Sequence, residues 1–387
     1  IPAGYEISYD QFQIPIQAEK RIYKANGPAL TTATSGDELT VSSSKVNFVF
    51  NKKSGLVTSY KVDGTEYFKD GFGIQPNFWR APNDNDYGNG APKRLQVWKQ
   101  SSKNFHVTDV KMTTENKVVS LKATYLLAAG NLYVVTYRIY PSGIVNVSAQ
   151  FTSTDMQAAE TEVSEATRMA TFTPGSDAAR KAASKLEVPR IGVRFRLPAQ
   201  MNNVQYFGRG PEENYIDRNH GTLVGVYKTT ADKMYFNYVR PQENGHHTDT
   251  RWIALSPDKG NGLAIVADSL IGFNALRNSI EDFDSEEALP HPYQWNNFSP
   301  EEVANHDEKA ARNVLRRMHH VNDITPRDFV EVCVDMKQQG VGGYDSWGAR
   351  PEPFHQIPAN RDYSWGFTLV PVRSASQANE VAKYDYQ

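Results

Sequence analysis

The sequence contains one cysteine, no long apolar run and no excess of either charge. Cys333 alone cannot form a disulfide within the chain or a zinc site built from four cysteine ligands. Lys and Arg number 42 against 44 Asp and Glu, which leaves a net charge of −2. A nucleic-acid surface needs a basic excess, and a membrane-spanning helix needs about 18 apolar residues in a row. We therefore predict no nucleic-acid partner and no membrane partner.

Common signatures of catalysis and cofactor binding are also missing. The sequence has no Gly-rich phosphate loop, no pair of histidines at helical spacing and no nucleophile elbow. His246-His247 and His319-His320 are adjacent pairs, and adjacent side chains point in different directions on helices and strands. This favours polar histidines at loops or strand ends over a metal pair. We predict no metal and no cofactor in this chain.

The residues that are abundant favour strands. The chain has 20 Tyr and 18 Phe, which are common in strands, and its 26 Gly and 21 Pro are spread along the sequence as turn residues. Asp63-Gly64 suits a type I′ hairpin turn, because both residues tolerate positive φ. Strands spaced about ten residues apart indicate an antiparallel sandwich or barrel rather than βαβ units. The predicted strands cover 46–50, 56–62, 65–68, 118–127, 132–140, 144–151 and 328–336.

Two domains are predicted, with a boundary at residue 37. Tyr5–Ile14 alternates like one strand and precedes a polar linker, which suggests a piece cut from a longer chain. Residues 38–387 form the large all-β antiparallel sandwich. Met156–Lys185 interrupts it as a long insertion, and Ser299 begins a helix with Pro at the first helical position and Glu at the third.

Three polar, aromatic-flanked clusters are candidates for chemistry. The first covers 77–90 and holds Arg80, Asp84, Asn85 and Gly88; the second covers 206–218; the third covers 342–348 and holds Asp345 and Trp347. Asx side chains also cap turns, so the first cluster equally fits a hydrogen-bonded loop in which Arg80 pairs with a nearby Asp. For the second cluster we favour structural Arg–Glu pairs.

Trp347 lies on a loop between glycines and suits a sugar platform. The C–H face of a pyranose loses water against an indole, while its hydroxyls need Asp, Asn or Arg partners. Burying about 60 Å² of apolar area contributes about 1.5 kcal/mol. That free energy orients a sugar and is far too small for catalysis. We expect a sugar to contact Trp347, Asp345, Arg80, Asp84, Asn85 and Gly88.

The order of these motifs closely resembles the C-terminal small-chain domain (domain 5) of glycoside hydrolase family 2 β-galactosidases. The resemblance covers about residues 40–385 and rests on 77–88, 208–218, 238–245 and 342–348. It implies a β-supersandwich similar to galactose mutarotase, preceded in residues 1–37 by the last strand of an immunoglobulin-like domain and a linker.

The resemblance also implies how such a domain works. The nucleophile and acid/base carboxylates of a retaining β-galactosidase, and the divalent cation (Mg²⁺) beside them, belong to a TIM-barrel domain upstream. Trp347 reaches from this domain into the β-galactoside pocket, and the tip at Gly88 lies near the pocket mouth. The chain alone is then inactive, and the parent is a homo-oligomer candidate.

Two other functions fit the same residues. A stand-alone mutarotase or epimerase needs a His acid and a carboxylate base at one anomeric centre. His220, His246 or His247 with Glu243 or Asp249 are the candidates for that pair. A carbohydrate-binding module needs only the platform and its polar partners.

Overall fold

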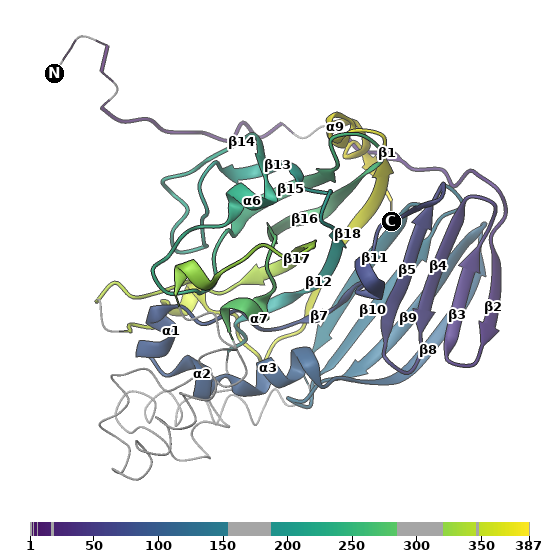
Figure 1. Ribbon diagram of the computed structural model, residues 1–387, viewed down its shortest axis with the longest axis horizontal. Coiled ribbons are helices and arrows are strands. Elements are labelled where there is room, and N and C mark those ends of the chain that lie inside the picture. The colour runs from purple at the N-terminus through teal and green to yellow at the C-terminus, as the bar shows by residue number, and fades with distance from the viewer. Residues whose placement is uncertain are drawn as a thin grey trace.

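The computed structural model describes residues 2–153, 187–284 and 320–386, apart from residues 3, 6, 17, 18, 346 and 347. Three predictions lie outside the described residues: the insertion at 156–185, the helix beginning at Ser299, and the placement of Trp347. Within them the chain is built mainly from antiparallel strands in two large sheets (Figure 1). The predicted all-β class is confirmed.

The larger sheet has twelve strands that all pair antiparallel. Its main path runs β14-β13-β15-β16-β18-β11-β10-β9-β8, and β16 also pairs with β17, which pairs with β12 and through it with β7. The strands are β7 Gln75–Asn77, β8 His106–Glu115, β9 Val118–Leu126, β10 Leu132–Ile139, β11 Val145–Thr152, β12 Arg190–Pro198, β13 Asn203–Gly210, β14 Leu223–Thr230, β15 His247–Ser256, β16 Gly262–Leu276, β17 Phe329–Gln338 and β18 Tyr363–Val372.

The smaller sheet is a meander of five strands that covers one end of the larger one. Its order β2-β3-β4-β5-β6 follows the sequence, and in Figure 1 it lies across β8–β10. The strands are β2 Thr31–Ser35, β3 Glu38–Ser42, β4 Val46–Asn51, β5 Leu56–Val62 and β6 Thr65–Glu66. The two facing sheets form the predicted sandwich.

Alternating side chains fill the space between these sheets. Phe48 of β4 and Tyr137 of β10 are fully buried, with ring centroids 5.6 Å apart. Two of the buried tyrosines have hydrogen-bonded hydroxyls: Tyr60 donates to the carbonyl of Gly143 at 2.6 Å, and Tyr125 to that of Gly55 at 2.8 Å. These two residues bury large apolar surfaces while their polar groups stay paired.

The hairpin turn at Asp63-Gly64 has the predicted geometry. Asp63 has φ 49° and Gly64 has φ 79°, as a type I′ turn requires at both central positions. The turn joins β5 to β6, and Val62 pairs directly with Thr65 across it.

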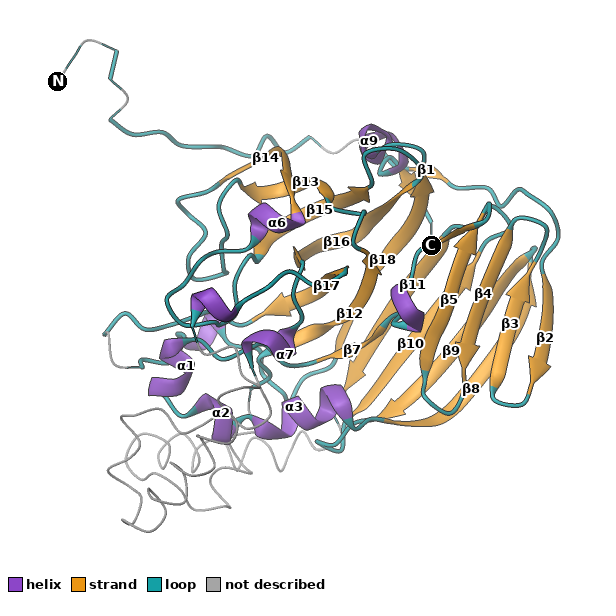
Figure 2. Ribbon diagram, in the orientation of Figure 1, coloured by secondary structure: helices purple, strands orange, loops and turns teal. Residues whose placement is uncertain are grey.

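Helices are short, and several gather at one end of the sheet (Figure 2). Three of them follow β7, and the first lies within the cluster 77–90, which also fitted a hydrogen-bonded loop. The helices are α1 Asp84–Gly88, α2 Ala91–Arg94, α3 Gln96–Lys103, α6 Ala231–Met234, α7 Ile280–Phe283 and α9 Ala378–Val381, with single turns η1 Lys69–Gly71, η4 Val321–Asp323, η5 Pro353–His355 and η6 Ala375–Gln377. Near the C-terminus, β19 (Tyr384–Asp385) pairs in parallel with β1 (Arg21–Ile22).

The first residues run along the outside of the molecule. The described residues of Tyr5–Ile14 form no strand, because they pair with no sheet edge of this chain. Only their side chains bind them to the rest of the protein. Gln11, for example, forms two hydrogen bonds with the backbone of Val224, at 2.7 and 2.8 Å. The boundary predicted at residue 37 falls in the turn between β2 and β3, which pair along their whole length. The assignment of residues 1–37 to another domain stays a prediction.

Candidate functional site

The motif segments of the sequence meet at the end of the large sheet where α1 lies (Figure 1). The first cluster follows β7, the second begins in β13 and continues beyond it, the third follows β17, and the segment 238–245 precedes β15. Hydrogen bonds connect each of these segments to another, as described below. We call this surface the motif face.

Arg80 is the internal anchor of the motif face. Its side chain is almost fully buried and forms a two-bond pair with Asp86, at 3.1 Å from Nε and 2.9 Å from Nη2. The remaining guanidinium donors bind the carbonyls of Gln339 and Gly340 at 2.8 and 3.0 Å. A guanidinium with these partners holds two loops together, so Arg80 is a positioning residue rather than a direct sugar contact.

A capping box makes residues 84–88 helical. The Asn83 side chain accepts from the amide of Asp86 at 2.9 Å, and the Asp86 carboxylate accepts from the amide of Asn83 at 3.2 Å. These bonds satisfy amides that the first turn of a helix leaves unpaired. Asp86 therefore links the cap of α1 to Arg80.

The third cluster packs directly on α1. Asn85 donates from its side-chain amide to the carbonyls of Val341 and Gly342, both at 3.2 Å. A Cβ added at Gly343 would lie 2.0 Å from the Asn85 amide nitrogen, and one at Gly348 would lie 2.4 Å from the backbone of Gly88. The glycines of this cluster are needed for the close approach of loop and helix.

The second cluster supports the same loop from the other side. The Asp217 carboxylate accepts from the amides of Val341 at 3.0 Å and Gly342 at 2.8 Å. One of its neighbours forms an Arg–Glu pair of the predicted kind, in which Arg218 lies 2.7 Å from Glu213. Arg209 instead pairs with an aspartate outside the cluster, at 2.5 Å from Asp249. The sequence did not single out Asp217, because its partners lie more than 120 residues away.

The segment 238–245 joins the N-terminus of α1. Gln242 accepts from the backbone amide of Asp84 at 3.0 Å. The Arg240 guanidinium lies 3.8 Å from the centre of the Tyr87 ring and 3.5 Å from the Asp84 carboxylate. The position of α1 is thus set from several sides, by Arg80, Asn85 and this segment.

A buried charge cluster lies beneath the motif face. Arg190 is fully buried, 3.1 Å from Glu243 and 3.2 Å from Asp335. Burial raises the pKa of Asp335 to about 7, with Arg190 opposing the shift and Glu243 adding to it. Burial also raises the pKa of Glu243 against the pull of Arg190. Two carboxylates that share one guanidinium in the interior favour holding a proton between them.

These two acids do not form a glycosidase pair on an open cleft. Asp335 has no exposed surface, and Glu243 borders a cavity of about 10 Å³. Such a volume holds about one water molecule and no sugar.

The acid–base pairs considered for a mutarotase do not assemble either. His246 and His247 are buried where β15 begins, and burial lowers the pKa of His247 to about 4 and that of His246 well below its usual range. His220 is exposed, and Asp249 pairs with Arg209. None of these three histidines lines the cavities that we find between the described residues.

The other predicted sugar contacts that the structure describes lie on the outside of the motif face. Asp84, Gly88 and Asp345 are exposed, and Asn85 is half-buried. Asp345 accepts from the amide of Ala349 at 2.9 Å, which closes its loop. Among the described residues, no group of three or more His, Cys, Asp or Glu side chains could hold a metal ion. No helix among them is long and apolar enough to cross a membrane.

Comparison with known proteins decides the family. The family model described as "Beta galactosidase small chain" matches residues 42–369. The chain belongs to the β-galactosidase small-chain family. It is 33% identical to a β-galactosidase of Priestia megaterium over 96% of this chain, and 25% identical to one of Streptococcus thermophilus over the same share. In both cases this small-chain member spans only 30% of the relative's length.

Solved structures similar to this small-chain member include mutarotases. A putative mutarotase from Salmonella typhimurium shares 8% identity, covers 92% of this chain and 97% of its own, and has a TM-score of 0.40. A galactose mutarotase related enzyme from Lactobacillus acidophilus shares 9% identity, covers 87% and 98%, and has a TM-score of 0.41. Values this low support no conclusion about function.

Proposed function

We propose that this chain is the C-terminal part of a retaining family 2 β-galactosidase, which hydrolyses terminal β-galactose residues. In this proposal the motif face forms one wall of the sugar pocket, and Trp347 adds an indole platform to it. The nucleophile, the acid/base carboxylate and the divalent cation belong to an upstream TIM-barrel domain.

The convergence of the motif segments carries the proposal. Asp84, Gly88 and Asp345 come from segments more than 250 residues apart, yet they belong to one exposed surface held by buried bonds. The bonds through Arg80 and Asn85 keep α1 and the 341–349 loop together without a ligand. Such preorganisation lowers the cost of ordering a site when sugar binds.

Exposed apolar side chains in the motif segments and close to them in sequence favour a neighbouring domain. Phe236, Val239, Tyr344 and Phe354 are exposed by 52, 85, 73 and 71%. Large apolar groups gathered on the loops of one face are typical of an interface. We assign this apolar rim to the contact with the upstream barrel.

The placement of the described acids supports locating the chemistry elsewhere. A retaining glycosidase needs two carboxylates about 5–5.5 Å apart on either side of the glycosidic bond. Glu243 of the motif segments and Asp335 of β17 share Arg190, but both are buried and so do not flank an open cleft.

The first test is hydrolysis of a chromogenic β-galactoside by the purified chain. We expect no turnover above that of buffer, while the full-length parent hydrolyses the same substrate. Turnover by the chain that survives repeated purification would contradict the proposal.

The second test replaces Trp347 in the full-length parent. Trp347→Ala should raise KM or lower kcat/KM by about tenfold or more, the loss expected when an aromatic platform is removed. Trp347→Phe keeps a ring and is the matched control, with most of the activity retained. Unchanged kinetics in the alanine variant would remove Trp347 from the pocket.

A further inference from the structure

A second cleft lies far from the motif face. It has a volume of about 410 Å³ and opens near the C-terminus, between η6–α9 and the β5–β6 turn. In Figure 1 the C-terminus and α9 lie at the upper right, whereas α1 lies at the lower left. The cleft shares no residue with the motif face, so the proposed β-galactosidase function does not account for it.

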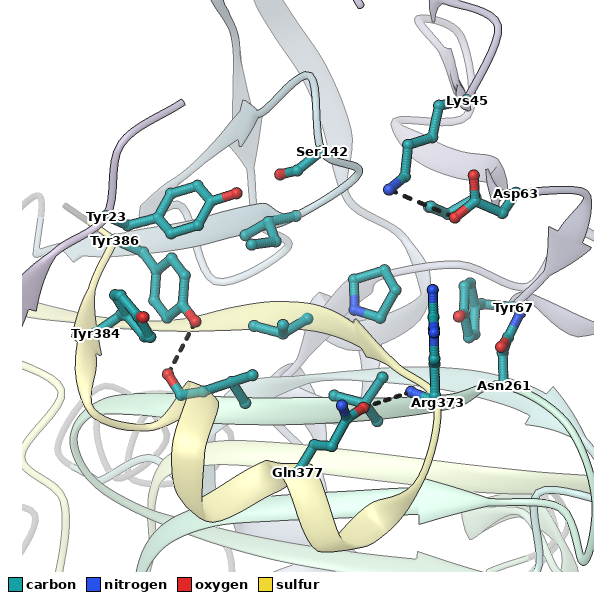
Figure 3. Close-up of a pocket in the computed structure, with 16 residues that line it drawn as sticks. Tyr23, Lys45, Asp63, Tyr67, Ser142, Asn261, Arg373, Gln377, Tyr384 and Tyr386 are labelled. Carbon is teal, nitrogen blue, oxygen red and sulfur yellow. Dashed lines mark hydrogen bonds and ion pairs between the residues drawn. The ribbon is translucent and has the colours of Figure 1, made fainter. Parts of the chain in front are cut away.

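Tyrosine rings form one side of this cleft. Tyr23, Tyr384 and Tyr386 contact one another, with ring centroids 5.1 to 6.3 Å apart, and Tyr67 lies across from them (Figure 3). Tyr386 donates its hydroxyl to the carbonyl of Val381 at 2.8 Å, which fixes its ring. Tyr386 is thus held in place, and Tyr23 and Tyr384 pack against its ring.

Polar groups with unused hydrogen-bonding capacity line the other side. The Ser142 hydroxyl is buried and has no partner among the described residues. Asn261 donates to Thr65 at 3.0 Å, and no described residue donates to its side-chain oxygen. The Ser142 hydroxyl has almost no accessible surface, so the Asn261 side-chain oxygen is the acceptor that this wall offers to a ligand.

The charged residues at the rim are two cations, Lys45 and Arg373, and one anion, Asp63. Lys45 lies 3.4 Å from Asp63, and both face the cleft in Figure 3. Arg373 also points into it, and its guanidinium forms no ion pair with a described residue. A guanidinium offers a fork of donors that matches neighbouring hydroxyls as well as a carboxylate.

We propose that this cleft is a second saccharide site, which binds a pyranose ring of a neutral sugar. The ring's C–H face would pack on Tyr384 and Tyr23, and its hydroxyls would reach Arg373 and Asn261. The volume lies within the range of about 300–1,000 Å³ found for small-molecule pockets. A purely apolar ligand would leave Arg373 and the Asn261 oxygen unpaired, and an anion alone would not use the rings.

The test is saturation-transfer NMR of the 387-residue chain with galactose, lactose and sorbitol. Galactose and lactose should bind with a Kd in the millimolar range. Sorbitol has similar hydroxyls but no ring, so it should give no saturable signal. Equal binding of sorbitol, or no binding of either sugar, overturns the proposal.

Variants locate the binding. Tyr384→Ala and Arg373→Ala should each weaken binding about tenfold, because each removes one side of the contact. Tyr384→Phe keeps the ring and should bind as the original does, which controls for folding. Tyr344→Ala changes the motif face and should leave this binding unchanged. Binding that is lost in Tyr344→Ala and kept in Tyr384→Ala would assign the sugar to the motif face and refute the second site.

Discussion

Single residues on the motif face act mainly by holding backbone segments in place, and Asp217 is the clearest case. Its carboxylate receives the amides of Val341 and Gly342, and hydrogen bonds to a charged group contribute more than neutral ones. Asp217→Asn replaces one acceptor with a donor. We expect it to lower the free energy of unfolding by about 1–3 kcal/mol in urea titrations.

Asp258→Asn is the matched control for this change. Asp258 accepts from the exposed Asn203 side chain at 2.9 Å, so its loss should cost little. Equal unfolding free energies for the two variants would show that the Asp217 bonds do not hold the 341–349 loop.

The buried charge cluster predicts a pH dependence of stability. The pKa of Asp335 is about 7 in the folded chain and is ordinarily 3.8, so the folded state binds a proton more tightly than the unfolded state. The stability that this proton contributes is fully present below about pH 4 and is lost as the pH rises through about 7. Between pH 5 and 8 this group should therefore lower the free energy of unfolding, by an amount on the order of 1–3 kcal/mol.

Asp335→Asn isolates this effect, because an amide does not titrate. The variant should lose less stability than the original chain between pH 5 and 8 in urea titrations at each pH. Asp258→Asn serves again as the exposed control, and its free energy of unfolding should change with pH as that of the original chain does. A pH profile of Asp335→Asn parallel to that of the original would contradict a proton held in the cluster.

At the residue scale the sequence predicts local partners better than distant ones. Arg80 and its partner lie only six residues apart, so the sequence alone predicts that Arg80 pairs with a nearby acid. The structure shows that this acid is Asp86. The partners of Asp217 and Gln242 lie over 120 residues away and depend on how the strands are ordered. No local pattern marks such residues, so their contacts could not be predicted from the sequence.

Among the elements, the contact between α1 and the 341–349 loop is the most constrained. Gly343 has φ +82°, and a Cβ there would overlap the Asn85 side chain. Gly343→Ala should cost more than the roughly 1–2 kcal/mol of a left-handed alanine, since Asn85 must also move away from the loop. Thermal unfolding of the chain and KM of the full-length parent would measure the two consequences.

Gly36→Ala gives the matched comparison. Gly36 has φ +57° in the β2–β3 turn and nothing within 4 Å of its added Cβ. Gly36→Ala should lower the free energy of unfolding only by the roughly 1–2 kcal/mol that an alanine in the left-handed conformation costs. If the two alanine variants are equally stable, close packing on Asn85 is not the reason for Gly343.

Strands were predictable from the sequence where they form hairpins. Val46–Asn51, Leu56–Val62 and the 118–152 meander follow an alternating pattern with marked turns, and each appears within one or two residues of its expected bounds. α1 was expected to be a loop, because its Asx-rich sequence is typical of turns. The signal was present in Asn83 with Asp86 three residues later, which is a helix cap.

At the scale of the whole molecule, the class of fold followed from the sequence but the strand order did not. The large sheet joins β16 to β17 and β17 to β12, pairs that local turns do not specify. That order brings the ends of β7, β13 and β17 to one side and so creates the motif face. The resemblance to the small-chain domain supplied the grouping of motifs that strand patterns alone could not.

The apolar rim predicts how the chain contacts the rest of the parent protein. If an upstream domain covers the motif face, Phe236, Tyr344 and Phe354 should be protected there and reactive in the isolated chain. Hydroxyl-radical footprinting of both proteins, read by mass spectrometry, measures this difference. Ile22 in β1 is 77% exposed and lies at the other end of the molecule, so it is the internal control. Equal reactivity of the three aromatic residues in the two proteins would mean that the rim faces water in the parent as well. The motif face would then not be a wall of a shared pocket, even if the parent hydrolyses β-galactosides.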